Sequence, residues 1–514
     1  MSILSRFFLG ILCIVLLMPN AVAQNRSSIW IFGDSAGIDF SNVLNPVPII
    51  SNCQSRGTVA SIADSAGDFL FYTSPKLRAG TAKQGKVYNR QFHLMDNGDS
   101  LQYVHGIYNS AIIIPNPAGN NQYYIFNVNS NVGLGSVNGL FYSVVDLNYN
   151  NGLGKVTTKN QHLITTDYMT DAMAAVKHGN GRDWWVLCKP LYIDTLTGGL
   201  ISSDTFYIYL VTPDSIHTPV KQCIGYNKAS WLGNFTFSSD GSKFNFVCYS
   251  GLSEIMDFDR CTGTMSNANI ITDSLWNMDN SFIGSAFSPN DSLLYIIKGV
   301  YYPFYLLQYD IYSQDMDTIA QITGTQTVVN RGRSPGHIRL APDGKIYMTA
   351  SYTDTLGYLY FPYADSCYFP ENMYLGVINN PNVKGVGCNF NNFGFYLGGK
   401  RTYWGLPNNP DYELGALQGS GCDTLTALKQ DPEIVKNNLF VYPNPAKDFV
   451  TIAFSKAVRT TCNLRLFNVL NKEVYRQNFV QQKVTVPIAN LAKGIYIVEV
   501  SNNGFKEYAK FVKE

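Results

Sequence analysis

Short runs of apolar, aromatic and β-branched residues alternate with clusters of Gly, Asn, Asp and Pro along almost the whole chain. Most runs are too short for a typical helix, and an apolar period of about 3.6 residues is nearly absent. Strands joined by tight turns produce this pattern. The sequence therefore predicts an all-β protein.

One pattern recurs six times: an apolar strand, a tight polar turn, and a strand rich in Tyr, Phe and Ile. Repeats of about 50 residues with several short strands each are typical of the blades of a β-propeller. In the turns, Asp and Asn tolerate the left-handed conformation, and Gly adopts it without steric cost. The repeats begin at Val59, Ala111, Met173, Phe235, Ser285 and Ile338.

A seventh blade is predicted from the two ends of this region, residues 24–399. The segment SSIWIF, residues 27–32, is expected to pair with NNFGFYLGG, residues 391–399. Pairing of the first and last strands would close the ring and remove its exposed sheet edges. The prediction is therefore a β-propeller of seven blades, six of them visible as repeats.

A smaller β domain is predicted at residues 439–514, after a linker at residues 400–438 that is rich in Gly, Asn and Pro. Seven short strands with turn signals between them predict a small immunoglobulin-like β-sandwich. Pro443 and Pro445 would stop an edge strand from pairing further.

The first 23 residues predict a signal peptide. Arg6 precedes a short apolar run, and Ala21-Val22-Ala23 fits a cleavage site. The run is shorter than the ~20 apolar residues of a membrane span, and no later stretch is long enough. We therefore expect export through the periplasm, either into the medium or to the outer-membrane cell surface, without a transmembrane segment.

Composition agrees with an exported β protein. The net charge is +1 and only 15% of the residues are charged, which argues against a nucleic-acid binder. An even set of eight cysteines in the large region fits several disulfides of open connectivity, and no Cys or His spacing fits zinc. Cys462 lies in an apolar strand pattern and is expected to be a buried free thiol. The eight are Cys53, Cys188, Cys223, Cys248, Cys261, Cys367, Cys388 and Cys422.

The six repeats resemble those of WD-repeat-like and TolB-like bacterial propellers. Residues 29–410 as a whole resemble a family of exported Bacteroidota propeller proteins. The matching segments are IWIFGDSAGIDF, ASIADSAGDFLFYT, VYNRQFHLMDNG and WGLPNNP. This resemblance implies a propeller fold and an exported location but no defined activity.

The C-terminal region closely resembles the type A sorting domain of the type IX secretion system. The matching segments are YPNPAKD from Tyr442, LRLFNVLNKEV from Leu464 and LAKGIYIVEV from Leu491. The resemblance implies that the secretion machinery is a partner, and that the tail is removed while the cargo is released or anchored on the surface. The residues implied in sorting are Tyr442, Pro443, Asn444, Pro445, Gly494 and Tyr496.

One segment suggests catalysis. Residues 33–37, GDSAG, fit the nucleophile elbow of hydrolases and the opening block of GDSL esterases, with Ser35 as nucleophile. Asp214 and His217 form the D-x-x-H that such enzymes use as acid and base. A real elbow lies on a parallel sheet with helices, and this sequence lacks the strand–helix alternation to build one. The esterase is therefore only an alternative.

Other candidate residues have a structural explanation beside the functional one. Six histidines occur singly, although His178 and His337 lie near repeats and could share a role. Four acidic residues recur in turns, where turn chemistry explains them better than Ca²⁺ does. Exposed tryptophans could stack on sugars, but packing between blades is the better explanation. The acidic residues are Asp64, Asp240, Asp291 and Asp343, and the tryptophans are Trp184, Trp185, Trp231 and Trp276.

We therefore predict a secreted or cell-surface propeller that recognises a protein or a polysaccharide without catalysis, and that needs neither a metal nor a cofactor. An extracellular hydrolase is the alternative, either a propeller glycosidase or lyase or the Ser35 esterase. A structural surface-layer component is a third class.

Overall fold

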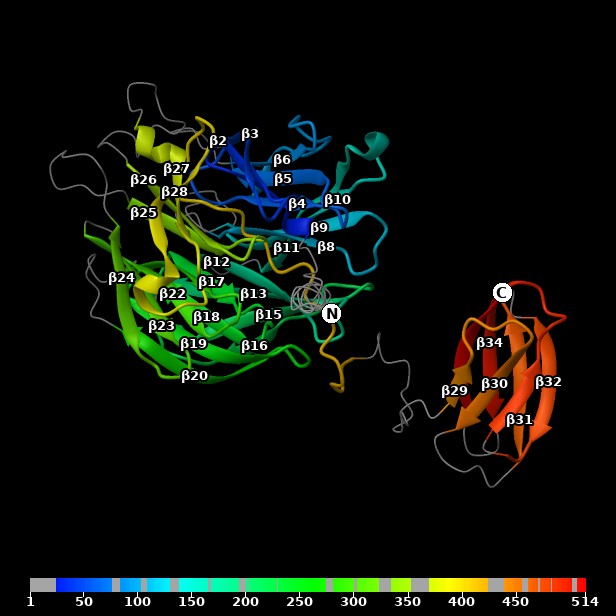
Figure 1. Ribbon diagram of the computed structural model, residues 1–514. Coiled ribbons are helices and arrows are strands. Elements are labelled where there is room, and N and C mark those ends of the chain that lie inside the picture. The colour runs from blue at the N-terminus through cyan, green and yellow to red at the C-terminus, as the bar shows by residue number, and fades with distance from the viewer. Residues whose placement is uncertain are drawn as a thin grey trace. The chain divides into compact units, whose positions relative to one another are not determined.

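The structure is a computed structural model (Figure 1) that describes residues 25–423 and 439–514 with internal gaps. The gaps are residues 76–83, 103–108, 130–137, 165–167, 194–199, 202, 229, 274–280, 300–302, 323–333, 353–368, 455–460, 470–471, 482 and 502–505. The predicted signal peptide, the linker end at 424–438, Trp276 and Cys367 lie outside the described residues. The chain divides into two compact units, Met1–Thr426 and Ala427–Glu514.

The larger unit contains seven antiparallel sheets among its described residues. The first sheet has three strands, β1 (Ile29–Phe32), β2 (Asp34–Asp39) and β3 (Val47–Gln54). The second has β4 (Ala60–Ala63), β5 (Phe69–Pro75), β6 (Gln84–Asn89) and β7 (Leu101–Gln102). The third has β8 (Ala111–Pro115), β9 (Gln122–Asn129), β10 (Gly139–Asp146) and β11 (Lys155–Ile164).

The remaining four sheets continue the same up-and-down order. The fourth has β12 (Tyr168–Lys177), β13 (Trp184–Ile193), β15 (Thr205–Val211) and β16 (Val220–Cys223), with β14 (Leu200–Ile201) paired to β13. The fifth has β17 (Gly233–Phe237), β18 (Lys243–Cys248), β19 (Leu252–Asp259) and β20 (Thr264–Asp273). The sixth has β21 (Phe282–Phe287), β22 (Leu293–Lys298), β23 (Phe304–Asp310) and β24 (Met316–Ile322). The seventh has β25 (Ser334–Leu340), β26 (Ile346–Ser351), β27 (Tyr374–Ile378) and β28 (Phe390–Tyr396).

The six sequence repeats coincide with the first two strands of the second to seventh sheets, which confirms their strand–turn–strand interpretation. The turn chemistry is also as predicted, because each of these turns contains at least one residue with positive φ. Five of the turns contain a glycine in this conformation, and the sixth contains an aspartate: Gly67, Gly119, Gly181, Gly241, Gly344 and Asp291. The turn at Gly119 also has Asn120 and Asn121 in this conformation, as predicted for asparagine. Asp64 and Asp240 accept backbone N–H groups within their own turns. Turn formation therefore accounts for these carboxylates.

Consecutive sheets pack through their first strands. β4 contacts β1 and β8, and contacts run on from β8 to β12, β17, β21 and β25. The first and seventh sheets share one apolar cluster, in which Trp30 and Phe40 lie edge-on to Tyr347 at 6.0 and 5.6 Å between ring centroids.

The predicted pairing of residues 27–32 with 391–399 was wrong. β1 pairs with β2, and β28 pairs with β27 inside the seventh sheet. The first sheet is instead a three-stranded meander of consecutive strands. A tight turn at Gly33, which has positive φ, folds β2 back against β1. The link between the ends is made instead by Arg401, whose guanidinium lies 2.6 Å from the Asp34 carboxylate.

Residues 400–423 also differ from the prediction of a linker, because they belong to the larger unit and much of the stretch is buried. Tyr403, Leu406 and Asn408 are almost completely inaccessible. A composition rich in Gly, Asn and Pro suits a solvated linker, but it equally suits an extended segment whose polar groups bond to surrounding strands. We call residues 402–417 the internal segment.

The smaller unit is a β-sandwich (Figure 1). One sheet has β29 (Leu439–Tyr442), β30 (Phe449–Phe454) and β33 (Lys483–Pro487). The other has β31 (Cys462–Asn468), β32 (Glu473–Phe479), β34 (Gly494–Ser501) and β35 (Lys506–Lys513). Alternate residues of both sheets form one core, which includes Val450, Leu464 and Val498. All seven predicted strands are therefore confirmed, whereas the immunoglobulin-like class stays a prediction.

Candidate functional site

The internal segment lies among the first strands of four sheets and bonds to each of them. The Asn408 backbone N–H donates to Val59 O (2.8 Å), next to β4. Asn408 Nδ2 donates to Ala111 O on β8 and Met173 O on β12, both at 3.0 Å. His337 on β25 donates its backbone N–H to Trp404 O (2.7 Å). Through its backbone and its side chain together, Asn408 thus links three sheets.

Close backbone approaches let the segment enter. A Cβ on Gly405 would overlap the carbonyl oxygen of Gly57, so only glycine fits at this position. Pro407 and Pro410 flank the two asparagines and have no N–H group that would need a partner. Further along, the Tyr412 hydroxyl donates to Ile113 O at 2.9 Å. The sequence WGLPNNP is therefore suited to a buried extended course.

His337 has a structural position beside this segment. Its ring is fully buried, and Nδ1 accepts the backbone N–H of Leu406 at 3.1 Å. Burial, with a smaller contribution from Arg339, lowers the His337 pKa to about 3, so the ring is neutral at physiological pH. His178 has separate partners, since Nε2 lies 3.0 Å from Cys261 O. The structure does not bring the two histidines into one site.

Arg339, on β25, is a functional candidate that sequence reasoning missed. Its guanidinium donates to Asn109 Oδ1 (2.9 Å) and to Asn408 Oδ1. Burial lowers its pKa to about 10, so it still carries a charge at neutral pH. No sequence pattern identified it, because its partners lie far away in the chain.

Three cavities lined by described residues have volumes of about 110, 220 and 180 Å³. The first lies beside the internal segment and is lined by Trp30, Arg339 and Asn409, among others. The second is lined by Arg260 and Leu414 and the third by Asp257 and Tyr309. Sites for drug-sized ligands usually measure about 300–1,000 Å³, so all three are small.

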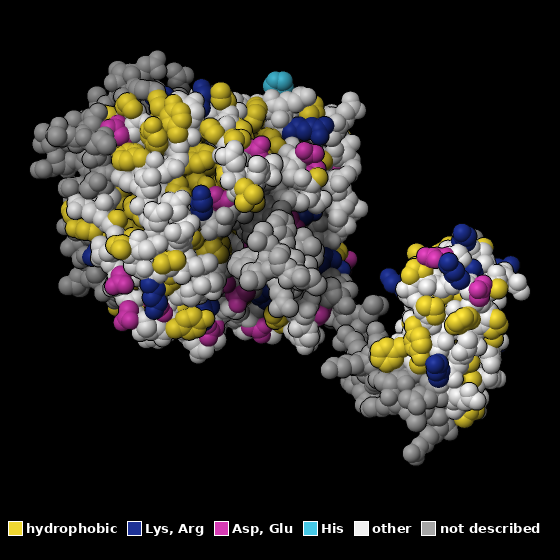
Figure 2. All heavy atoms as spheres, in the orientation of Figure 1, with side chains coloured by type: hydrophobic (Ala, Val, Ile, Leu, Met, Phe, Trp, Pro, Cys, Tyr) yellow, Lys and Arg dark blue, Asp and Glu magenta, His cyan; other side chains and the backbone are white. Residues whose placement is uncertain are grey.

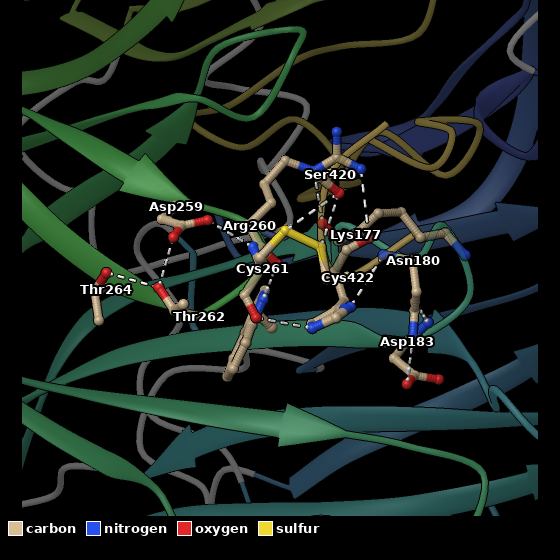
Figure 3. Close-up of a disulfide and its surroundings, with 12 residues drawn as sticks. Lys177, Asn180, Asp183, Asp259, Arg260, Cys261, Thr262, Thr264, Ser420 and Cys422 are labelled. Atoms are coloured by element: carbon tan, nitrogen blue, oxygen red, sulfur yellow. Dashed lines mark hydrogen bonds between the residues drawn. A yellow bond between two sulfur atoms is a disulfide. The ribbon is translucent and has the colours of Figure 1, made fainter. Parts of the chain in front are cut away.

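A disulfide anchors the end of this region (Figure 3). Cys261, in the turn after β19, is bonded to Cys422, 161 residues further along. A Cβ on Gly179 would collide with both sulfurs, so the turn after β12 must have glycine there. Arg260 donates to Gly415 O (2.5 Å) and Lys177 O (2.9 Å), which binds the segment to the same turns.

Several disulfides were predicted, and the described residues contain one. Cys223 is exposed and forms no disulfide, and Cys462 is buried and forms no disulfide, as predicted. Four further cysteines form no disulfide and are buried, three of them in strands and Cys388 at the end of the 3-10 helix Gly385–Cys388. A buried cysteine packs as a small hydrophobic residue. The four are Cys53, Cys188, Cys248 and Cys388.

Replacing both Cys261 and Cys422 by serine is expected to destabilise the larger unit by about 3 kcal/mol, because the bond closes a long loop in the unfolded chain. Urea unfolding followed by tryptophan fluorescence measures this, since all six tryptophans lie outside residues 427–514. Cys223→Ser is the matched control and should leave the transition unchanged. Equal midpoints for the double variant and the wild type would contradict a stabilising role.

A buried pair of charged residues lies between the fourth and fifth sheets. Lys189 Nζ lies 4.2 Å from the centroid of the Phe206 ring, and Glu254 Oε2 accepts the Tyr226 N–H at 2.8 Å. Burial raises the pKa of Glu254 to about 7 and lowers the pKa of Lys189 to about 8. Both side chains are almost fully inaccessible, so they lack the substrate access that an acid–base pair needs.

The raised pKa of Glu254 predicts a pH-dependent stability. In the folded protein Glu254 keeps its proton up to about pH 7, whereas in the unfolded chain it loses the proton near pH 4.5. The stabilisation that this group contributes is therefore fully present below pH 4.5 and is lost as the pH rises through 7. The loss is up to about 3 kcal/mol. Glu254→Gln should remove this part of the pH dependence of unfolding. The control substitution Asp317→Asn, at an exposed position, should leave the pH dependence of unfolding unchanged. If the unfolding free energy of Glu254→Gln varies with pH as that of the wild type does, the prediction is contradicted.

The predicted sugar-stacking tryptophans are mostly packed inside. Trp184 is fully buried against Tyr412, and Trp185 is buried and donates Nε1–H to Arg260 O at 2.7 Å. Trp231 is half-buried, edge-on to Tyr168 at 5.7 Å. Packing between strands accounts for the first two.

The structure does not bring the esterase residues together. Ser35 lies in β2 of the first sheet, with φ 62°, and not between a strand and a helix. Asp214 and His217 are exposed in the connection between β15 and β16 of the fourth sheet. His217 Nε2 lies 3.0 Å from the Thr212 hydroxyl, its hydrogen-bond partner.

Charged side chains of both signs are scattered over the visible face of the larger unit (Figure 2). Among the described residues, no group of three His, Cys, Asp or Glu side chains is arranged to hold a metal ion. The same part of the chain contains no helix with the length and hydropathy to span a bilayer.

The predicted sorting residues of the smaller unit come together. The loop after β29 docks on β35, where Asn444 Oδ1 accepts the Val512 N–H (2.9 Å) and Ala446 donates to Val512 O (2.8 Å). Tyr442, Pro443 and Pro445 lie on this exposed loop or at its start. Tyr496 is stacked on Phe511 at 5.5 Å, and Gly494, opposite Lys513, begins β34. Motifs from both ends of the unit therefore form one continuous region.

Residues 440–514 match the family described as "Secretion system C-terminal sorting domain". The tail is a type IX sorting domain. It marks the chain for secretion or for the cell surface, as its motifs predicted. The family covers only this tail, and no curated protein matches the chain.

Solved structures resemble the chain only distantly. A candidate 6-phosphogluconolactonase from Bacteroides fragilis has 9% identity and a TM-score of 0.43, covering 74% of this chain and 96% of that one. Another from Bacteroides uniformis has 14% identity and a TM-score of 0.39, covering 61% and 84%. The Dos1 propeller has 10% identity and a TM-score of 0.38, covering 66% and 70%. At these values the likeness carries no inference about activity.

Proposed function

We propose that the protein is an exported, non-enzymatic β-propeller that recognises a protein or a polysaccharide through the loops between its strands. The observation that carries the proposal is the internal segment. It occupies the space among the first strands, where a propeller enzyme would need its pocket, and the cavity beside it measures about 110 Å³. Recognition is then left to the surface loops.

A closed ring of seven blades is part of this proposal. The chain of contacts from β1 through β25 supports it, as does the aromatic cluster of Trp30, Phe40 and Tyr347 between the first and last sheets. Stacked sheets form a rigid scaffold because each buries the face of its neighbour. Loops held on such a scaffold can bind a large, flat partner without a deep pocket.

The placement of Ser35 and His217 argues against the esterase form of the hydrolase alternative. Ser35 belongs to the first sheet and His217 to the fourth, and the hydrogen bond of His217 goes to Thr212. A nucleophile and its base must lie within hydrogen-bond reach of each other.

The proposed function also includes a route of export from the cell. In the proposed route, the signal peptide of residues 1–23 directs the chain to the periplasm, and the sorting domain then directs it across the outer membrane. The sorting domain is afterwards removed and the propeller is released or anchored at the surface. A propeller protein of Bacteroidota origin, with partners outside the cell, fits this route.

A binding screen tests the proposal. The exported protein is applied to a glycan array and, after crosslinking on intact cells, recovered with its partners. We expect saturable binding to one glycan class or one surface protein, unchanged in Ser35→Gly, which removes the hydroxyl and suits the positive φ at this position. Glycoside hydrolysis, ester hydrolysis that is lost in Ser35→Gly, or an absence of any partner would overturn the proposal.

A further inference from the structure

We propose that the cavity beside the internal segment binds one small anion, a carboxylate or an inorganic oxyanion, through the guanidinium of Arg339. This inference goes beyond recognition by surface loops, because the site lies among the first strands of the sheets. The cavity is lined by residues of six sheets and by residues 407–411 of the internal segment.

Three residues that line the cavity have buried N–H groups without an acceptor among the described residues. They are Arg339 Nε, Asn409 Nδ2 and Trp30 Nε1. The orientation of the Asn409 amide is set by its Oδ1, which accepts the Ser61 N–H at 3.4 Å. A buried N–H group without an acceptor costs about 1–3 kcal/mol, so three around one cavity indicate an absent acceptor.

The charge of Arg339 is not balanced by a carboxylate. Its guanidinium donates hydrogen bonds to two neutral amide oxygens, on Asn109 and Asn408. Asp411 also lines the cavity, but its Oδ1 accepts the Glu413 N–H at 2.9 Å, and its carboxylate interacts electrostatically with Arg260 and Lys177. A desolvated guanidinium without a counter-ion is unfavourable, and an anion in the cavity would offset its charge.

Size and geometry select the kind of anion. A volume of about 110 Å³ holds a few water molecules or one small oxyanion, and it excludes a sugar ring. The planar fork of a guanidinium matches two oxygens of a carboxylate, phosphate or sulfate better than a spherical ion. The anion is therefore either free in solution or the acidic group of a partner molecule.

Thermal unfolding of the exported protein tests the site. Sodium acetate, phosphate or sulfate is titrated at constant ionic strength against sodium chloride, and unfolding is followed by tryptophan fluorescence. We expect one of these oxyanions to raise the Tm saturably in the wild type. Arg339→Gln should weaken the response at least about tenfold, whereas exposed Arg90→Gln should respond as wild type does. A Tm rise of equal size in Arg339→Gln, or none up to 100 mM, would overturn the proposal.

A crystal soak keeps the test independent of how well the variants fold. Selenate should give an anomalous peak within hydrogen-bond distance of Arg339 and Asn409 in the wild-type protein. Water alone at this position under saturating selenate would refute the anion site. A peptide with an acidic side chain that binds more tightly than acetate would identify the source as a partner, and equal affinities would identify a free anion.

Discussion

A chain that ends at residue 438 is expected to accumulate in the periplasm, with surface or secreted protein reduced by at least about tenfold. The sorting domain of residues 440–514 forms a compact unit of its own, so its removal leaves the larger unit intact while it deletes the export signal. Cell fractionation with immunoblotting and protease accessibility on whole cells measures the distribution. Normal surface display of the truncated chain would contradict the role assigned to the tail.

Two substitutions test whether export requires the intact fold of the sandwich. Phe511→Ala removes a fully buried ring that is stacked on Tyr496 beneath the docked loop, and should impair export. Val469→Ser changes a side chain that is 72% exposed, and should export normally. If both variants are exported equally, the folded sandwich is not what the machinery recognises.

Asn408→Ala is expected to destabilise the larger unit by about 3 kcal/mol. The side chain donates to Ala111 O and Met173 O, so its removal leaves two buried carbonyl groups without these donors. It also takes an acceptor from Arg339. Urea unfolding of the full chain, followed by tryptophan fluorescence, reports this unit.

Gln418→Ala is the matched control, since Gln418 is exposed just beyond the internal segment. It should unfold with the wild-type midpoint. If Asn408→Ala also unfolds at the wild-type midpoint, the internal segment does not stabilise the packing of the sheets, which would contradict the role assigned to it.

Local patterns predicted the strands well. Each repeat combines an apolar alternation with a turn residue that tolerates positive φ, and both are properties of a few neighbouring residues. The seven strands of the tail followed for the same reason. The partner of β1 was mispredicted. The turn at Gly33 pairs β1 with β2, and an apolar pattern alone does not specify which strand pairs with which.

The interior could not be predicted in the same way. Residues 402–417 have the composition of a linker, and their burial depends on contacts such as Asn408 with Met173, 235 residues away. The partnership of Cys261 with Cys422 and the position of Arg339 depend on the same fold. Sequence reasoning named the tryptophans at 184 and 185 as candidate binding residues but favoured packing, and both are buried. Aromatic content alone does not distinguish packing from binding.

An experimental structure of the exported protein at high resolution tests the central claim most directly. The account predicts seven sheets in a closed ring, with residues 402–417 running among their first strands and Cys261 bonded to Cys422. An open arc of sheets, or an interior empty of this segment, would contradict it.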